Sequence, residues 1–228
     1  MTAEGVGQLV IGNAEDKSGN SATTTATINL DKFDPTINAT KTPLANINGW
    51  NNSDVTISFG CADSGSGIAT CPASTLLNTE GAGQVISGTT TDLSGKSESL
   101  TTTVNIDKTA PTIQIGFPEE GVVLTESSLI VSGTISETNP IASFTINSQP
   151  VIPAMDGSFT HEFVLLEGDN TITVSAMDIA DNSGSTTVNV TFNPNKPPSI
   201  NSAPLTGQPK TLSITMTSMP ATLMPETG

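Results

Sequence analysis

The sequence contains an internal repeat, and this repeat restricts the possible folds more than any other feature. Residues 7–37 and residues 83–113 align without a gap, 76 residues apart, and share Gly, Asp-x-Ser-Gly, Asn-x-Asp-Lys and Pro-Thr-Ile positions. A third, more diverged copy of the ending occupies residues 167–200. Internal repeats indicate a chain built from successive small units rather than from one large globule. The three copies therefore predict three module endings.

The repeats divide the chain into four segments. Residues 35–110 and 111–196 are two complete modules, each of the roughly 70–100 residues of a small β-sandwich. Residues 1–34 supply only the last strands of a truncated module, so Met1 is interpreted as an internal start, a gene-prediction error or an artificial boundary within a longer protein. This interpretation also accounts for the lack of a signal peptide at the start. Residues 197–228 form a tail of different character.

Apolar and polar residues alternate along the modules, which is the pattern of half-buried β-strands. Val55, Ile57, Phe59 and Cys61 follow this pattern. A turn signal that begins with Asp separates the last two strands of each module, because an Asp side chain accepts hydrogen bonds from the backbone two residues further on. No stretch has a helical period, so the sequence predicts an all-β fold of sandwich modules. The turn signals are DKSGN at Asp16, DLSGK at Asp92 and DIADN at Asp178.

The composition excludes several classes of partner. Seven Lys and no Arg stand against 22 acidic residues, which gives a net charge of −15. Such a surface cannot neutralise a row of phosphates, so neither nucleic acid nor an anionic membrane surface is expected as a partner. The longest apolar runs are far shorter than the roughly 20 residues that span a bilayer, so no membrane insertion is expected. With 35% apolar and 4% aromatic residues, the modules should have thin aliphatic cores.

Two segments resemble known families of modules. Residues 35–110, with NGWNNSDVTISFGCADSGSGIATCP and the linker DKTAPTI, resemble the tandem Ig-like repeats of secreted bacterial proteins. Residues 117–192, with FPEEGVVLTESSLIVSGTISE and EGDNTITVSAMDIADN, resemble the Ig-like domain B that accompanies glucodextranase and other secreted bacterial enzymes. The resemblance implies tandem Ig-like β-sandwich modules at an extracellular or cell-surface location. It also implies a non-catalytic role as spacer, adhesion unit or accessory to carbohydrate-active domains.

Two cysteines and one tryptophan are candidate site residues. Cys61 and Cys71 lie ten residues apart, and in a chain that resembles extracellular proteins we expect a disulfide between them. Free thiols are the main alternative, because a structural zinc site needs four N or S ligands and the single His161 lies in another module. Trp50 is expected to pack over the end of its sandwich, and contact with a sugar ring is the second interpretation.

Acidic side chains near the module junctions could meet and bind Ca²⁺, which takes about six to eight oxygen ligands. Two observations weigh against such a site: the sequence has no EF-hand loop, and Lys32 and Lys108 directly follow two of the acids. We therefore expect no cofactor, with Ca²⁺ at the junctions as the alternative. The acids concerned are Asp31, Asp34 and Asp107 near the linkers and Glu15, Asp16 and Asp92 in the turns.

No set of residues predicts catalysis. His161 is in phase with Phe159 and Phe163 along one strand, so it is interpreted as a half-buried structural side chain without a nucleophile partner. Neighbouring acids such as Glu119 and Glu120 point to opposite faces of a strand and do not converge as an acid/base pair. We therefore expect no enzyme activity.

The tail ends in MPETG at residues 224–228, which is close to the Leu-Pro-x-Thr-Gly signal that sortases cleave. Against a wall anchor, Met stands in place of Leu, and no apolar stop-transfer segment or basic tail follows. A reading frame shifted by one nucleotide could encode an acidic strand that resembles cadherin-like Ig modules. We therefore favour out-of-frame translation that begins between about Pro204 and Ser213, with a wall anchor and an ordinary disordered tail as alternatives.

The sequence thus predicts a non-catalytic structural and adhesive spacer within a larger secreted or cell-surface bacterial protein. Its short Pro-containing linkers restrict the hinges between modules. The alternative is a carbohydrate-binding accessory module of an extracellular glycoside hydrolase. The expected partners are neighbouring modules of the same chain, together with a polysaccharide or another surface protein.

Overall fold

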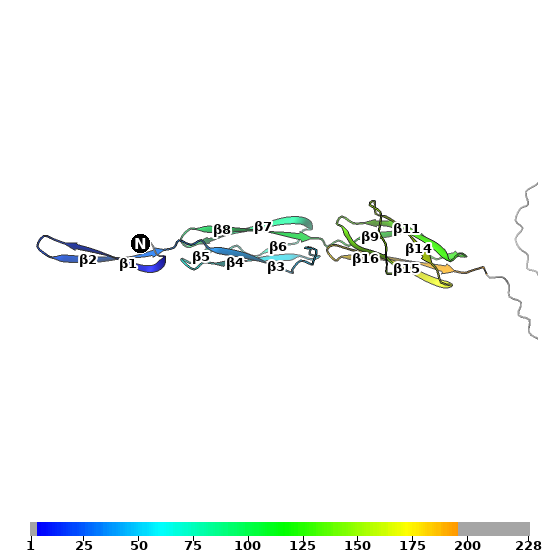
Figure 1. Ribbon diagram of the computed structural model, residues 1–228, viewed down its shortest axis with the longest axis horizontal. Coiled ribbons are helices and arrows are strands. Elements are labelled where there is room, and N and C mark those ends of the chain that lie inside the picture. The colour runs from blue at the N-terminus through cyan, green and yellow to red at the C-terminus, as the bar shows by residue number, and fades with distance from the viewer. Residues whose placement is uncertain (1–3, 196–228) are drawn as a thin grey trace, which may run out of the picture. The chain divides into compact units, whose positions relative to one another are not determined.

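The computed structural model describes residues 4–195, and the tail of residues 197–228, with its interpretation, lies outside this range. The described residues form strands and loops without any helix (Figure 1). Consequently, none of them belongs to a helix long and apolar enough to cross a membrane. The predicted all-β fold is confirmed.

The first element is an antiparallel hairpin of β1 (Gly5–Glu15) and β2 (Ser21–Leu30). It forms a sheet of its own, and most of its side chains are exposed. Ile28 is 41% exposed, whereas Val104, its counterpart in the repeat, is 3% exposed. The repeated sequence therefore forms the same hairpin twice, and within residues 4–195 only the second copy packs into a buried core.

The first sandwich contains two antiparallel sheets of three strands each, with a small core between them. Val55 and Ile57 of one sheet pack with Val104 and Ile106 of the other, and all four are buried. The alternation of apolar and polar residues places these side chains on one face of each strand. The sheets consist of β3 (Thr36–Thr42), β4 (Val55–Ala62) and β6 (Thr75–Leu77), and of β5 (Ile68–Thr70), β7 (Gly81–Asp92) and β8 (Ser97–Ile106).

A disulfide joins the two sheets of the first sandwich. Cys61 lies in β4, Cys71 directly follows β5, and their Cα atoms are 5.9 Å apart. This separation is normal for a disulfide. Four buried side chains form the described core of this sandwich and twelve form that of the second, so the covalent link supports the thinner of the two cores.

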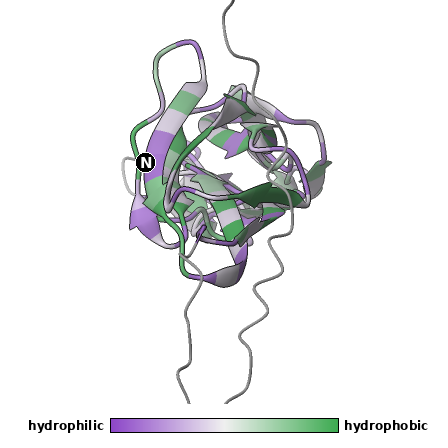
Figure 2. Ribbon diagram, turned by 90° about the vertical axis from the view of Figure 1, so that its right-hand side faces the viewer, coloured by the Kyte–Doolittle hydropathy of each residue, from purple (hydrophilic) through white to green (hydrophobic). Residues whose placement is uncertain are grey.

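The second sandwich pairs a sheet of three strands with a sheet of five. All neighbouring strands are antiparallel except β10 and β16, which are parallel. Phe144 and Phe159, one from each sheet, have ring centroids 5.0 Å apart within the core. Hydrophobic and hydrophilic residues alternate along the strands (Figure 2). The sheets consist of β14 (Ser158–Val164), β11 (Ser128–Ser136) and β9 (Thr112–Phe117), and of β10 (Val122–Leu124), β16 (Ser183–Phe192), β15 (Gly168–Asp178), β12 (Ile141–Ile146) and β13 (Gln149–Pro150).

A turn built on Asp follows β1, β7 and β15, as the turn signals predicted. In the third turn, the fully buried Asp178 accepts hydrogen bonds at Oδ1 from the N–H groups of Ala180 (2.7 Å) and Asn182 (3.0 Å). The side-chain amide of Asn182 donates to the other oxygen, Oδ2, at 2.9 Å. In the first turn, Asp16 accepts the corresponding hydrogen bonds, at Oδ1 from the N–H groups of Ser18 and Asn20 and at Oδ2 from the side-chain amide of Asn20. Burial of the Asp178 carboxylate is tolerated because these donors replace water.

We predict that changing both Cys61 and Cys71 to serine lowers the free energy of unfolding of the first sandwich by about 2–3 kcal/mol, because the disulfide restricts the unfolded chain. Urea unfolding followed by the fluorescence of Trp50, the single tryptophan, measures this change within that sandwich. Reduction of the unmodified protein should cause a similar shift. An unchanged midpoint in both experiments would contradict the prediction.

We further predict that Asp178→Ala lowers the free energy of unfolding of the second sandwich by about 2–3 kcal/mol, because buried donors lose their acceptor. Calorimetric unfolding measures the loss. The control is Asp156→Ala, which removes an exposed carboxylate that accepts hydrogen bonds from Ser158 in the same sandwich, and it should have a much smaller effect. Equal losses in the two variants would argue against the importance of the buried turn.

Candidate functional site

Two linkers each begin with an aspartate. The backbone carbonyl oxygen of this aspartate accepts a hydrogen bond from a side chain in the Asp turn of the sandwich that follows the linker. Asp31 comes after β2, and its carbonyl oxygen accepts a hydrogen bond from Lys96 Nζ at 2.6 Å. Asp107 comes after β8, and its carbonyl oxygen accepts one from Asn182 Nδ2 at 2.8 Å. Lys96 and Asn182 occupy the same place, four residues after the Asp of their turns. The two linkers are therefore anchored by the same device.

Three carboxylates meet at the first linker. Asp31 of the linker, Asp63 after β4 and Asp92 at the end of β7 each place one oxygen within 4.8 Å of the other two. Asp92 is 1% exposed, and the side chain of Asp31 is 7% exposed. Among the acidic, His and Cys side chains of residues 4–195, these three form the group whose ligand atoms lie close enough together to share one metal ion.

Backbone N–H groups hold the first two of these carboxylates in place. Asp31 accepts a hydrogen bond at Oδ2 from the N–H of Ser66, at 2.8 Å. Asp63 accepts two at Oδ2, from the N–H groups of Gly65 (3.0 Å) and Gly67 (2.7 Å). The Asp-Ser-Gly-Ser-Gly sequence after β4 thus folds into a turn around its own aspartate, which is the local preference of Asp in turns. This turn also brings the N–H of Ser66 to the linker.

Two oxygens of the cluster are buried and receive no hydrogen bond. Asp92 accepts bonds at Oδ1 from the Ser94 hydroxyl and the Lys96 N–H, both at 2.9 Å, while its Oδ2 has no partner. The Oδ1 atom of Asp63 is likewise buried without a partner. A buried carboxylate oxygen without a donor is costly unless a cation compensates it.

The hydrogen bonds determine how two of the carboxylates titrate. Hydrogen bonds from Ser66 outweigh burial and lower the pKa of Asp31 below its ordinary value. Burial acts to raise the pKa of Asp92, but the bonds from Lys96 and Ser94 outweigh it and hold this pKa below its ordinary value too. Both groups are therefore ionised at neutral pH. The neighbouring cation is Lys96, whose Nζ lies 3.6 Å from Asp31 Oδ1.

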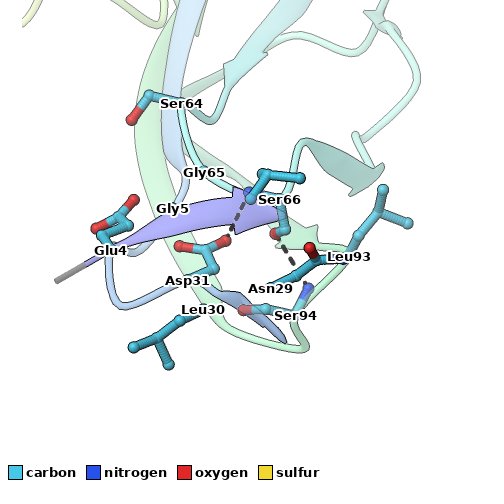
Figure 3. A pocket seen from close by; sticks show the side chains of 11 residues that line it. Glu4, Gly5, Asn29, Leu30, Asp31, Ser64, Gly65, Ser66, Leu93 and Ser94 are labelled. Carbon is cyan, nitrogen blue, oxygen red and sulfur yellow. Dashed lines mark hydrogen bonds between the residues drawn. The ribbon is translucent and has the colours of Figure 1, made fainter. Parts of the chain in front are cut away.

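A pocket opens beside the cluster, and Figure 3 shows the carboxylates of Glu4 and Asp31 near each other in it. Ser66 binds Asp31 with its N–H and accepts a hydrogen bond from the N–H of Ser94 at its hydroxyl oxygen (Figure 3). The Oε2 atom of Glu4 is buried without a hydrogen-bond partner. Gly65 leaves room for the Asp31 carboxylate, since a Cβ atom at this position would overlap it.

The structure brings together two of the six acids considered for Ca²⁺, Asp31 and Asp92. It adds Asp63, which the sequence analysis missed. The available signal was an Asp followed by Ser-Gly at the end of a strand, the same kind of turn signal that was recognised at Asp92. The other four acids, Asp34, Asp107, Glu15 and Asp16, do not belong to the cluster.

The remaining candidate residues lie elsewhere. Trp50 is half-buried in the loop that connects β3 to β4, and its backbone N–H donates to Asn46 Oδ1 at 3.0 Å. Its contact with a sugar ring stays a prediction. His161 is half-buried in β14, opposite Val131 of β11.

Comparison with known proteins adds a family for the second sandwich. Residues 111–194 match the family model of glucodextranase, domain B. No curated protein matches the chain. The chain is also similar to a solved structure of the CbhA fibronectin(III)-like modules of Clostridium thermocellum, with 18% identity over 70% of this chain and 94% of that chain and a TM-score of 0.34. The resemblance predicted for residues 117–192 is confirmed by the family match, and the second sandwich is thus similar to domain B of glucodextranase.

Proposed function

We propose that the chain is a non-catalytic spacer segment of a larger secreted or cell-surface bacterial protein, with residues 35–110 and 111–196 as its modules. The match of the second sandwich to a domain of glucodextranase supports membership of a larger, multidomain protein. The disulfide supports an oxidising, extracellular location, because disulfides are rare in the cytosol. The net charge of −15 favours solubility and repulsion between copies.

The observation that carries the proposal is the repeated anchoring of the linkers. A spacer has to keep its modules in a fixed arrangement along the chain, so the linkers between the modules must have restricted conformations. Lys96 binds the carbonyl oxygen of Asp31, and Asn182 binds that of Asp107, from the same place in their turns. A linker whose backbone is fixed at its first residue has fewer conformations available, as has a linker that contains proline.

Further side-chain amides link the two sandwiches across the second linker. Asn139 Nδ2 donates to Asp107 Oδ2 at 2.8 Å. Asn46 Nδ2 and Asn48 Nδ2, which precede β4, donate to the carbonyl oxygen of Ile179 at 2.8 and 3.1 Å. These polar bonds supply directional constraint, which suits a semi-rigid spacer.

A second candidate function is that of a carbohydrate-binding accessory module. The observation that favours it is the family match, since the matched family is named after a carbohydrate-active enzyme. Trp50 is the residue that would stack on a sugar ring, although the chain has a single Trp and no Tyr from which to build an aromatic platform.

We predict that the two sandwiches tumble as one body and that the double variant Asn48→Ala/Asn139→Ala separates their motion, because it removes hydrogen bonds across the second linker. The readout is ¹⁵N relaxation of the full chain, which gives one rotational correlation time for both sandwiches in the unmodified protein and two shorter ones in the variant. Asn20→Ala, in the hairpin turn, is the matched control and should leave the single correlation time of the two sandwiches unchanged. Independent tumbling of the unmodified sandwiches would refute the spacer proposal.

We also predict that insoluble starch, cross-linked dextran and cellulose retain no more of the unmodified protein than of the Trp50→Ala variant. A pull-down followed by quantification of the bound fraction decides between the two candidates. Retention of the unmodified protein that is lost in Trp50→Ala would overturn the spacer proposal in favour of the accessory module.

A further inference from the structure

The three Asp turns differ in how they compensate the second carboxylate oxygen. In the first and third turns, the side-chain amide of the Asn four residues later donates to Oδ2, from Asn20 to Asp16 and from Asn182 to Asp178. In the second turn this position is Lys96, whose ammonium group binds the linker carbonyl instead. The Oδ2 atom of Asp92 is consequently buried without a donor.

The aspartates that begin the two linkers differ in the same way as the turns, because one has hydrogen-bond donors around its carboxylate and the other has further carboxylates. At the second linker, Asp107 Oδ2 receives a side-chain amide from Asn139, and Asp107 Oδ1 accepts the N–H of Thr109. At the first linker the corresponding place is occupied by the Asp63 turn, which adds a third carboxylate with an unpartnered oxygen. The same location in the fold is therefore supplied with donors at one linker and with extra negative charge at the other.

The spacing of the oxygens fits a single ion. Two oxygens that bind one calcium ion at about 2.4 Å can be at most about 4.8 Å apart. One oxygen from each of Asp31, Asp63 and Asp92 meets this limit. The ligand set consists of oxygen alone, which favours calcium or magnesium over zinc.

We propose that Asp31, Asp63 and Asp92 bind a calcium ion that fixes the first linker to the ends of β4 and β7. This site goes beyond the spacer role and does not rest on it. Lys96 Nζ lies 3.6 Å from Asp31 Oδ1, and the charge of one ammonium group offsets that of only one of the three carboxylates.

The pocket beside the cluster contains a further carboxylate. Glu4 lines the pocket next to Asp31 and has a buried oxygen without a partner. Glu4 does not belong to the group whose oxygens lie within 4.8 Å of one another, so water would have to complete the six to eight oxygens, or thereabouts, that calcium takes. Calcium accepts a variable number of oxygens, whereas magnesium requires a small, near-octahedral set of ligands.

The test is calcium binding to the full chain, measured by isothermal titration calorimetry after treatment with EDTA. We expect one ion with a Kd of about 0.1–1 mM, as for extracellular modules. At about 5 mM Ca²⁺, the unfolding temperature of the first sandwich should rise by about 5–10 °C. Magnesium at the same concentration should cause a clearly smaller rise, and sodium chloride of equal ionic strength should cause none.

Asp63→Asn is the key variant, because an amide keeps one oxygen to accept the N–H groups of Gly65 and Gly67. We expect calcium affinity to fall by about tenfold or more in this variant and in Asp92→Asn. Asp156→Asn, an exposed turn acid of the second sandwich, is the matched control and should bind calcium as the unmodified protein does. Urea unfolding in EDTA, followed by Trp50 fluorescence, verifies that each variant is folded.

Lys96→Met gives an independent test, because it removes the competing positive charge. We expect this variant to bind calcium about three- to tenfold more tightly. The proposal is overturned if the folded, unmodified protein binds no calcium at about 5 mM. It is equally overturned if Asp63→Asn and Asp92→Asn leave the affinity unchanged.

Discussion

A carboxylate that is buried at the end of a strand has to be compensated by hydrogen-bond donors or by a cation, and the turns and linkers of this chain depend on that requirement. Asp178 is fully buried and meets backbone N–H groups at one oxygen and the amide of Asn182 at the other. Asp92 accepts the N–H of Lys96 and the hydroxyl of Ser94 at Oδ1, but no amide reaches its Oδ2. The difference lies in the residue four positions after the Asp: where it is Asn, both carboxylate oxygens receive donors, and where it is Lys, one oxygen is left without a donor.

The same residue position also controls the linkers. Lys96 and Asn182 both reach back to the carbonyl oxygen of the aspartate that begins the linker, so the turn and the linker share one side chain. Each sandwich has a core of its own, and the bonds across the second linker are polar. The linkers are therefore restrained by a few directional hydrogen bonds, together with the burial of Pro35 and Pro111. Such restraint can be changed by a single substitution or by an ion without disturbing either core.

Much of the fold could be predicted from local pattern. Val55 and Ile57, predicted on the buried face of a strand, are fully buried. These predictions succeed because a period of two residues determines which face of a strand is apolar. The candidate site was harder. Asp31 and Asp92 were recognised as acids near a junction, while Asp63 was overlooked because a turn acid after a strand has many structural uses and only its neighbours in space distinguish it.

The sequence by itself determined the strands, the turns and the number of repeat endings, since alternation and Asp-Gly or Asp-Asn turn chemistry act over a few residues. The resemblance of residues 117–192 to a known family could also be read from it. Only the tertiary structure decided that Cys61 and Cys71 connect opposite sheets and that Asp31, Asp63 and Asp92 converge. Convergence depends on strand register and linker path, which bring residues up to 61 positions apart to within one ion's reach, and no local pattern encodes that distance.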